Sequence, residues 1–411
     1  MLAYVSGQNP ICNILTELVI LFINKLKLMG MEEGIKDNAA SAPNSRPSNQ
    51  FRALLPMRVL QVFLLFFVLV LGISVISMHM IKYLNIQTLA PSTLISHYDE
   101  RITLESFIKP PASVWHSMND SELLWRASME PRILEYPFKR VPKMAFMFLT
   151  KGPLPFAPLW ERFFKGHEGF YSIYVHALPD YRSDFPSSSV FYRRQIPSQY
   201  VAWGEMSMCD AERRLLANAL LDISNEWFVL LSEACIPIRG FNFVYRYVSR
   251  SRYSFMGSVD EDGPYGRGRY SYAMGPEVSL SEWRKGSQWF EINRALAVEI
   301  VEDMVYYHKF KEFCRPPCYV DEHYFPTMLS IGYSDLLANR TLTWTDWSRG
   351  GAHPATFGKA DIAERFLKKL SRGQACFYND KPSQVCYLFA RKFSPSALEP
   401  LLKLAPKVLG F

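Results

Sequence analysis

The chain has 411 residues, of which 49% are hydrophobic and 21% are charged. This composition supplies enough apolar material for a packed core and excludes a wholly disordered, collagenous or coiled-coil protein. The formal net charge is +7, but the 46 basic residues are scattered among 39 carboxylates. That scatter argues against a nucleic-acid-binding tail, so no nucleic-acid partner is predicted.

A long apolar segment, 59–81, precedes most of the chain. It carries no formal charge and would reach about 34 Å as a helix, which is enough to cross a bilayer. A buried core helix is the alternative, but such helices rarely run this long without a charged face. Arg46, Arg52 and Arg58 lie just before the segment and only Lys82 lies close after it. The positive-inside rule therefore predicts a signal anchor of a single-pass type II membrane protein, with a luminal C-terminal part.

The anchor divides the chain into four predicted parts. Residues 1–58 form the cytosolic tail, which is expected to be largely disordered because its later half is rich in Asn, Ser, Pro and Ala. The anchor at 59–81 is followed by a luminal stem at 82–140, which mixes prolines with short apolar clusters. Residues 141–411 are predicted to form the catalytic domain.

Short apolar runs alternate with amphipathic segments in this last part. Strands that alternate with helices predict an α/β fold with a mostly parallel sheet and helices on both faces. Ligands of such sheets lie at the carboxyl ends of the strands, so we expect the chemistry in the loops there. Strands are predicted at 144–149, 171–178, 190–196, 227–231 and 253–259, and helices at 157–165, 206–223, 241–248 and 321–330.

An acidic turn follows the predicted strand at 253–259. Its Asp260 and Asp262 form an Asp-x-Asp pattern, which could hold a divalent cation on a nucleotide diphosphate. We favour the simpler interpretation, an exposed acidic turn, because Gly263 and Pro264 follow directly.

A second acidic pair, Asp321 and Glu322, begins the predicted helix at 321–330. Acidic residues in the first turn of a helix are ordinary partners of its dipole. A carboxylate at the mouth of a cleft can equally act as a general base, and the residues alone leave both roles open. Arg267 and Arg269 lie in an earlier Gly-rich loop and could meet an anionic ligand.

Six of the seven cysteines lie beyond the predicted anchor, an even count that fits an oxidising compartment. Their pairing cannot be chosen from sequence, and some could be buried thiols. Cys314 and Cys318 could form a zinc site with His308 and His323, but the histidines straddle the cysteines instead of forming a close pair. We therefore expect no bound metal. The six cysteines are Cys209, Cys235, Cys314, Cys318, Cys376 and Cys386.

Eight ordered sequence blocks resemble the core-2/I-branching β-1,6-N-acetylglucosaminyltransferases, glycosyltransferase family 14. The similarity is greatest to a plant subgroup that includes the brittle-culm type glycosyltransferases of grasses. So many blocks in order are specific for the family and far less specific for the substrate. The resemblance implies a GT-A-like nucleotide-sugar-binding domain. The blocks are FMFLTKG, WGEMSMCDAERRLLANAL, WFVLLSEACIPI, GRGRYSYAM, GSQWFEINRALA, YVDEHYFPTML, LTWTDWSRGGAHP and YLFARKF.

The resemblance implies a catalytic base and an acceptor pocket. The base of the family is the glutamate of its Asp-Glu pair, which is Glu322 here. Trp344 matches an acceptor-pocket tryptophan, and Asp346 stands where the animal enzymes have an aromatic residue. We also assign Arg269, from the block GRGRYSYAM, to the acceptor side.

The resemblance also implies a donor site in which basic side chains, instead of a metal ion, neutralise the diphosphate. The lysine of the family's last block is Lys392 here, and Arg372 before Cys376 is the nearest match to a partner arginine. His176 stands where the animal enzymes have an aspartate near the uridine. Thr150, in the first block, completes the predicted donor site.

The expected activity is an inverting, metal-independent transfer from a UDP-sugar to a glycan or cell-wall polysaccharide in the Golgi lumen, without a cofactor. A single displacement needs only one base, and fixed cations can stabilise the leaving UDP. N-acetylglucosamine is the first expectation for the donor sugar. The alternatives are a glucuronosyltransferase that acts on arabinogalactan and a catalytically silent, glycan-binding membrane scaffold. Asn119 and Asn339 begin sequons that would be glycosylated in the lumen.

Overall fold

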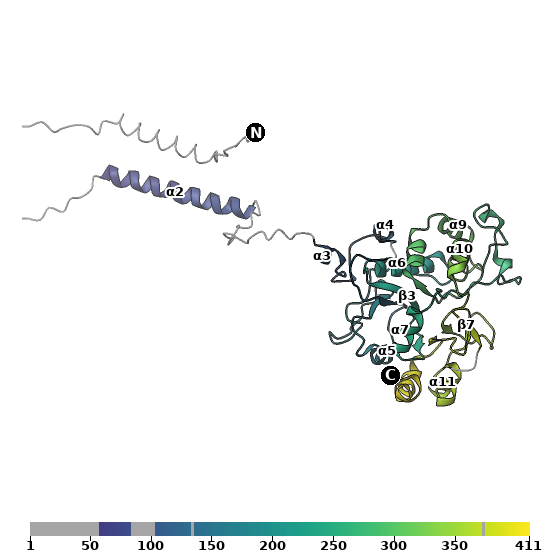
Figure 1. Cartoon of the computed structure of the whole chain (residues 1–411). Coiled ribbons are helices and arrows are strands. Elements are labelled where there is room, and N and C mark those ends of the chain that lie inside the picture. The colour runs from purple at the N-terminus through teal and green to yellow at the C-terminus, as the bar shows by residue number, and fades with distance from the viewer. Residues whose placement is uncertain (1–56, 84–102, 133–134, 372–374) are drawn as a thin grey trace, which may run out of the picture. The chain divides into compact units, whose positions relative to one another are not determined.

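The computed structural model describes residues 57–83, 103–132, 135–371 and 375–411 (Figure 1). The chain divides into two compact units, Met1–Ser96 and His97–Phe411. In the first unit, the predicted anchor at 59–81 lies within helix α2 (Met57–Tyr83). Within the described ranges, no helix is long and apolar enough to cross a membrane. The predicted tail, except for its last two residues, and the first part of the predicted stem lie outside the described residues.

A four-stranded mixed sheet forms the centre of the second unit, with the strand order β2-β1-β3-β5. β1 (Lys143–Leu149) pairs in parallel with both β2 (Tyr171–His176) and β3 (Asn225–Ser232). β5 (Glu291–Asn293) is antiparallel to β3. The predicted α/β class and three of the predicted strands are therefore confirmed, while the sheet as a whole is mixed.

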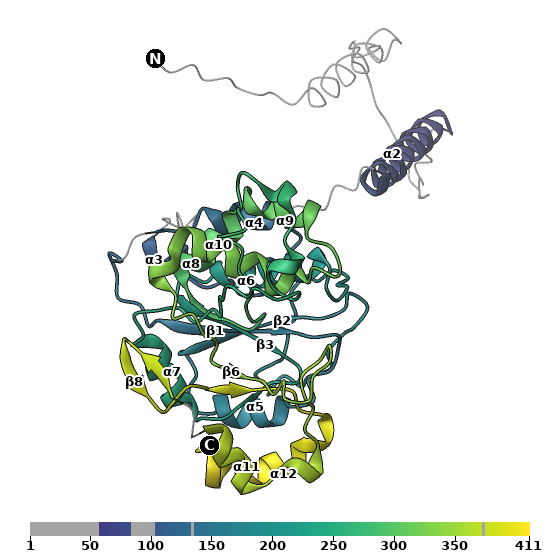
Figure 2. The same cartoon turned by 90° about the vertical axis from the view of Figure 1, so that its right-hand side faces the viewer.

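Both faces of this sheet are covered, which explains the uninterrupted apolar run in β1. Met144, Phe146 and Phe148 enter one apolar core, and the alternate residues of β1 enter the other. Figure 2 shows the sheet between the two helical layers. One core contains side chains of α4 (Asp120–Ser128), α6 (Met206–Leu220), α8 (Arg294–Glu302), α9 (Tyr306–Phe313) and α10 (Tyr324–Tyr333). The other contains side chains of α5 (Ala157–Phe164), α7 (Phe241–Ser249), α11 (Glu364–Ser371) and α12 (Leu398–Leu404).

Two smaller sheets support the C-terminal part of the fold. β4 (Ile236–Pro237) and β6 (Thr343–Trp344) flank β9 (Phe389–Ala390) in a three-stranded sheet. β7 (Cys376–Tyr378) and β8 (Lys381–Ser383) form a separate hairpin.

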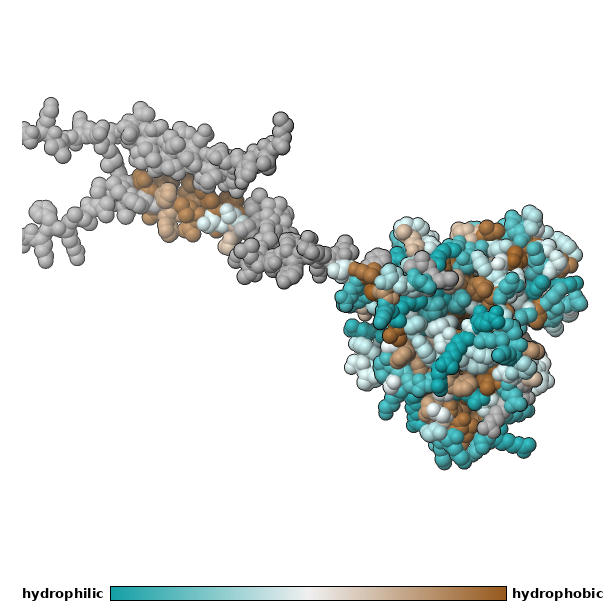
Figure 3. All heavy atoms as spheres, viewed as in Figure 1, coloured by the Kyte–Doolittle hydropathy of each residue, from teal (hydrophilic) through white to brown (hydrophobic). Residues whose placement is uncertain are grey.

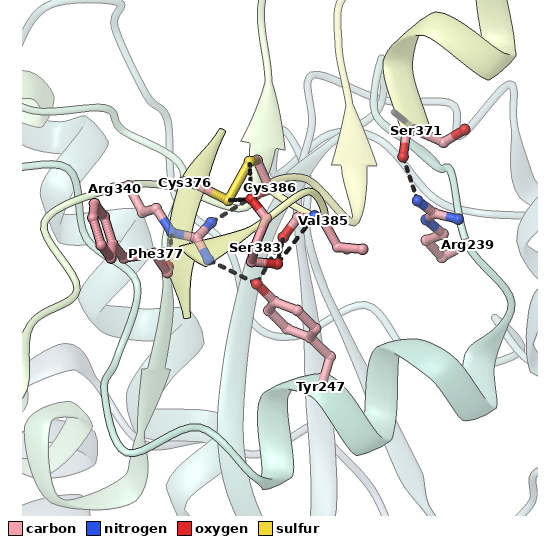
Figure 4. Close-up of a disulfide and its surroundings, with 9 residues drawn as sticks. All are labelled: Arg239, Tyr247, Arg340, Ser371, Cys376, Phe377, Ser383, Val385 and Cys386. Carbon is pink, nitrogen blue, oxygen red and sulfur yellow. Dashed lines mark hydrogen bonds between the residues drawn. A yellow bond between two sulfur atoms is a disulfide. The ribbon is translucent and has the colours of Figure 1, made fainter. Parts of the chain in front are cut away.

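A disulfide and an arginine fix this hairpin to the body of the domain (Figure 4). Cys376 is bonded to Cys386, and Arg340 donates hydrogen bonds to the carbonyl oxygens of Cys386 (2.7 Å) and Phe377 (3.1 Å). Arg340 also donates to the hydroxyl of Tyr247 in α7, at 2.7 Å. The chain that leads into β9 is therefore held at several points.

Two predicted strands were wrong, and two predicted helix boundaries were displaced. One of these is the end of α6, which lies at Leu220 instead of residue 223. Residues 190–196 form only one bridge, between Val175 and Gln195, so their apolar pattern reflects burial in turns. Residues 253–259 bridge three separate partners, Leu337, Glu291 and Lys285, and therefore form no continuous strand. The helix predicted from residue 321 begins as a 3-10 turn at Val320–Glu322, and α10 follows it.

Four of the six cysteines of the second unit form disulfides. Cys314 is bonded to Cys318, which contradicts the zinc alternative because neither thiolate is left to bind a metal. Cys209 and Cys235 are buried free thiols. In the part of the chain that the structure describes, no group of three or more His, Cys, Asp or Glu residues could hold a metal ion.

Glu291 of β5 provides a test of the buried core. Its carboxyl group accepts a hydrogen bond from the Leu342 amide (3.2 Å), yet burial raises its pKa from 4.5 to about 8. Between pH 4.5 and about pH 8, Glu291 keeps its proton in the folded state but has released it in the unfolded chain. The free energy of unfolding therefore falls as pH rises through this range. Relative to Glu291→Gln, we expect the wild type to lose about 2–5 kcal/mol between pH 5 and pH 9 in urea denaturation. A constant difference between the two proteins would contradict a neutral Glu291 in the fold.

Candidate active site

Three of the predicted donor-site residues lie at the carboxyl ends of the parallel strands. Thr150 follows β1, and His176 ends β2. The segment after β9 returns to the end of β3, where the Phe393 amide donates to the Ala234 carbonyl oxygen at 3.0 Å. Lys392 precedes Phe393 and is thus brought to the end of the central sheet where ligands of α/β folds bind.

Glu322 occupies the 3-10 turn before α10, and its carboxylate is held by Arg269. The Arg269 guanidinium donates to Glu322 Oε2 at 2.8 Å; the Arg269 side chain is 8% exposed and that of Glu322 is 27% exposed. The Glu322 carbonyl oxygen accepts from the Gly286 amide at 2.7 Å. A Cβ at Gly286 would lie 1.9 Å from the Gly257 carbonyl oxygen, so only glycine allows this close approach. The carboxylate is therefore oriented by its surroundings and still accessible.

His323 orients Arg269 from the buried side. Its Nδ1 lies 2.8 Å from the Arg284 carbonyl oxygen and must donate a proton to it, so Nε2 is free to accept from Arg269 at 3.3 Å. Burial lowers the pKa of His323 to about 3, which keeps the ring neutral. The sequence singled out His323 only as a zinc ligand, so this positioning role was missed.

Asp321 and Glu322 differ in burial, and this difference decides which of them can meet a substrate. The Asp321 side chain is buried, and burial, reinforced by the charge of Glu322, raises its pKa to about 6. Beside it lies Glu212 of α6, also fully buried, whose pKa burial raises well above the usual value and whose Oε1 accepts from Gln288 at 2.8 Å. Only Glu322 of the pair is exposed enough to meet a substrate.

Lys392 follows the half-buried Arg391. The Arg391 guanidinium lies 4.1 Å from the centre of the Trp289 ring. The half-buried Lys392 ammonium group forms no ion pair with any residue that the structure describes.

The predicted donor residues Thr150 and His176 lie in a buried polar network. The Thr150 amide donates to the His176 carbonyl oxygen at 2.9 Å. His176 Nε2 accepts from Arg214 at 2.8 Å, and Arg214 binds both carboxylate oxygens of Asp120 at 2.7 Å. Burial lowers the pKa of His176 to about 3, so the ring is neutral. Contact of these residues with a nucleotide stays a prediction.

The predicted acceptor residues Trp344 and Asp346 make local contacts. The Trp344 ring packs against Phe357 and Phe366, with centroid distances of 5.7 and 6.2 Å. Asp346 accepts from the Ser348 amide at 2.9 Å, and its hydrogen bonding to Ser348 lowers its pKa. Their role toward an acceptor stays a prediction.

The Asp-x-Asp turn is engaged by basic side chains. Arg267 donates to both carboxylate oxygens of Asp260, at 2.7 and 2.6 Å, and pairs with Asp262 at 2.9 Å. Glu261, between them, pairs with Lys285 at 3.0 Å. These contacts agree with the acidic-turn interpretation.

Three predicted residues remain. Arg372 is outside the described residues. Asn119 is exposed and caps α4, where its side chain accepts from the Glu122 amide at 3.0 Å. Asn339 is also exposed, and it accepts from the Ser258 amide at 2.7 Å. Glycosylation of both asparagines stays a prediction.

An accessible carboxylate and a lysine at the end of an α/β sheet are groups that a sugar transferase can use as base and fixed cation. Residues 144–371 match the family model of the Core-2/I-Branching enzyme, so the chain belongs to that family. The chain is also 35% identical over 309 residues to "Glycosyltransferase BC10" of Oryza sativa subsp. japonica, which covers 64% of this chain and 76% of the rice protein. The predicted family is confirmed, and the chain is a glycosyltransferase with a nucleotide-sugar donor and a glycan acceptor.

Proposed function

We propose that the chain is an inverting glycosyltransferase that needs no metal ion and moves N-acetylglucosamine from UDP-N-acetylglucosamine to a glycan hydroxyl. One observation carries this proposal: the accessible carboxylate of Glu322 is held by Arg269, and the segment that carries Lys392 is brought to the end of β3. This arrangement supplies one base and one fixed cation, which are the groups that a single displacement needs.

In the proposed reaction, Glu322 takes the proton of the acceptor hydroxyl while that oxygen attacks the anomeric carbon. Attack comes from the face opposite the leaving UDP, so the configuration inverts and a second catalytic carboxylate is unnecessary. The C–O bond to UDP breaks, and negative charge grows on the diphosphate. The ammonium group of Lys392 stabilises that charge more in the transition state than in the ground state.

We also propose that the second unit lies in the Golgi lumen. This proposal rests on the uncharged segment 59–81 and the arginines before it in the sequence, since α2 itself, as far as the structure describes it, is not long and apolar enough to cross a membrane. The apolar side chains described in α2 are exposed (Figure 3), as expected of a helix whose natural surroundings are lipid. The two disulfides of the second unit are typical of an oxidising compartment. Treatment with a glycosidase should lower the mass of the wild type but not that of the double variant Asn119→Gln with Asn339→Gln. This result would support luminal exposure, whereas an unglycosylated wild type would count against it.

The donor can be identified without a known acceptor. The purified full-length chain would be incubated with UDP-N-acetylglucosamine, UDP-glucuronic acid, UDP-galactose, UDP-glucose and UDP-xylose, and release of UDP would be measured. We expect slow hydrolysis, fastest for UDP-N-acetylglucosamine. Fastest hydrolysis of UDP-glucuronic acid would favour the glucuronosyltransferase alternative. No hydrolysis of any donor would favour the silent scaffold.

A further inference from the structure

Three rings that the family resemblance does not assign form an exposed cluster near the candidate base. The side chain of Trp203, just before α6, is 51% exposed. Its ring lies 4.7 Å from that of Tyr319 and 5.2 Å from that of His353, measured between centroids. We call Trp203, Tyr319 and His353 the aromatic platform. An exposed tryptophan among other rings is a common mark of a ligand-binding surface.

The platform is connected directly to the base. Tyr319 comes three residues before Glu322, and the Arg269 guanidinium lies over the Tyr319 ring at 4.7 Å. The same guanidinium donates to Glu322 at 2.8 Å. One guanidinium therefore contacts both the platform and the candidate base.

Two features restrain the part of the platform around Tyr319. Gly204 has φ +79°, and a Cβ there would lie 2.7 Å from the Tyr319 ring, so glycine permits the contact between Trp203 and Tyr319. Cys318, the neighbour of Tyr319, is held by its disulfide to Cys314. A surface that needs no ordering on binding gains affinity from each contact it makes.

We propose that the aromatic platform binds the second sugar of the acceptor glycan, so that the enzyme selects acceptors of at least two sugars. The proposal rests on the proposed role of Glu322, because the group next to the base must be the acceptor that loses its proton. A pyranose ring presents a face of C–H groups that packs on an aromatic ring, while its hydroxyls stay in water. The platform offers such a surface, and its Tyr319 ring contacts Arg269.

The test uses the full-length variants Trp203→Ala and Trp203→Phe, with Trp125→Ala as the control. Trp125, on α4, is 66% exposed and contributes no ring to the platform. The probes are neutral tetrasaccharides of β-1,3-galactan, β-1,4-glucan, β-1,4-xylan and N-acetyllactosamine, together with their methyl monosaccharides. Affinity is measured by calorimetry in the presence of UDP.

We expect the wild type to bind at least one tetrasaccharide and Trp203→Ala to bind it about tenfold more weakly. Trp203→Phe should lose less, and Trp125→Ala should lose nothing. Hydrolysis of the UDP-sugar by Trp125→Ala should stay within about twofold of the wild type, since Trp125 belongs to neither the platform nor the predicted donor site.

Four outcomes would contradict the proposed platform. Two concern the wild type: it binds no tetrasaccharide, or it binds the monosaccharide as tightly as the tetrasaccharide. Two concern Trp203→Ala: it binds the tetrasaccharide as tightly as the wild type does, or it binds UDP more weakly than the wild type does. The last result would mean that the rings stack on uracil instead. Failure of the proposed function is a separate result, because the wild type would then hydrolyse no donor. If the wild type hydrolyses the donor and Trp203→Ala binds the glycan with unchanged affinity, only the proposal of the platform is rejected.

Discussion

Glu322→Gln should reduce the rate of sugar transfer by about 10²–10⁴-fold while the affinity for UDP stays within about twofold. The amide keeps the shape of the side chain and an oxygen that can accept from Arg269, so the loop should retain its geometry. It cannot take the proton of the attacking hydroxyl, so the loss falls on the chemical step. Turnover and calorimetric UDP affinity, measured on the same preparation, separate the two effects.

A matched control removes a carboxylate that lies away from the site. Glu399 of α12 is 82% exposed and pairs with Lys359 at 3.1 Å. Glu399→Gln should leave both transfer and UDP affinity unchanged, because exposed ion pairs contribute little. Full activity in Glu322→Gln would show that another group is the base, and the buried Asp321 would be the next residue to examine.

The strands with long apolar runs could be predicted, and the short ones could not. β1 and β3 are buried on both faces, so their sequences show continuous apolar runs. β4, β6 and β9 have two residues each and depend on partners far along the chain, so no local period marks them. The error at 190–196 has the opposite cause, since apolar residues there are buried without a ladder.

The candidate site, like the fold, could be predicted only in part from the sequence. Family blocks in the sequence identify Glu322 and Lys392, but they do not tell which carboxylate of the pair faces solvent. That distinction comes from the burial of Asp321 beside Glu212, from a helix more than one hundred residues earlier in the chain. Sequence also gives no sign that Arg269 bridges Glu322 and the ring of Tyr319, because these contacts join separate loops.

The charge that stabilises the leaving diphosphate can be assigned by comparing Lys392 with the acidic turn. If Asp260 and Asp262 held Mg²⁺ or Mn²⁺, a chelator would remove the main stabilisation of the leaving group. In the structure Arg267 already occupies both carboxylates, and Lys392 is free of ion pairs among the described residues. We therefore expect donor hydrolysis to continue in excess EDTA, measured as release of UDP.

Lys392→Ala should lower kcat/KM by about 10²–10³-fold and weaken UDP binding, because it removes a fixed charge from the leaving group. Lys359→Ala, which removes an exposed lysine from α12's ion pair with Glu399, should have no effect on either quantity. The double variant Asp260→Asn with Asp262→Asn breaks ion pairs whose acidic side chains are 36% and 86% exposed, so it should cost less than about tenfold. Loss of hydrolysis in EDTA that Mn²⁺ restores, together with a larger defect in the double variant than in Lys392→Ala, would instead place a metal ion on the Asp-x-Asp turn.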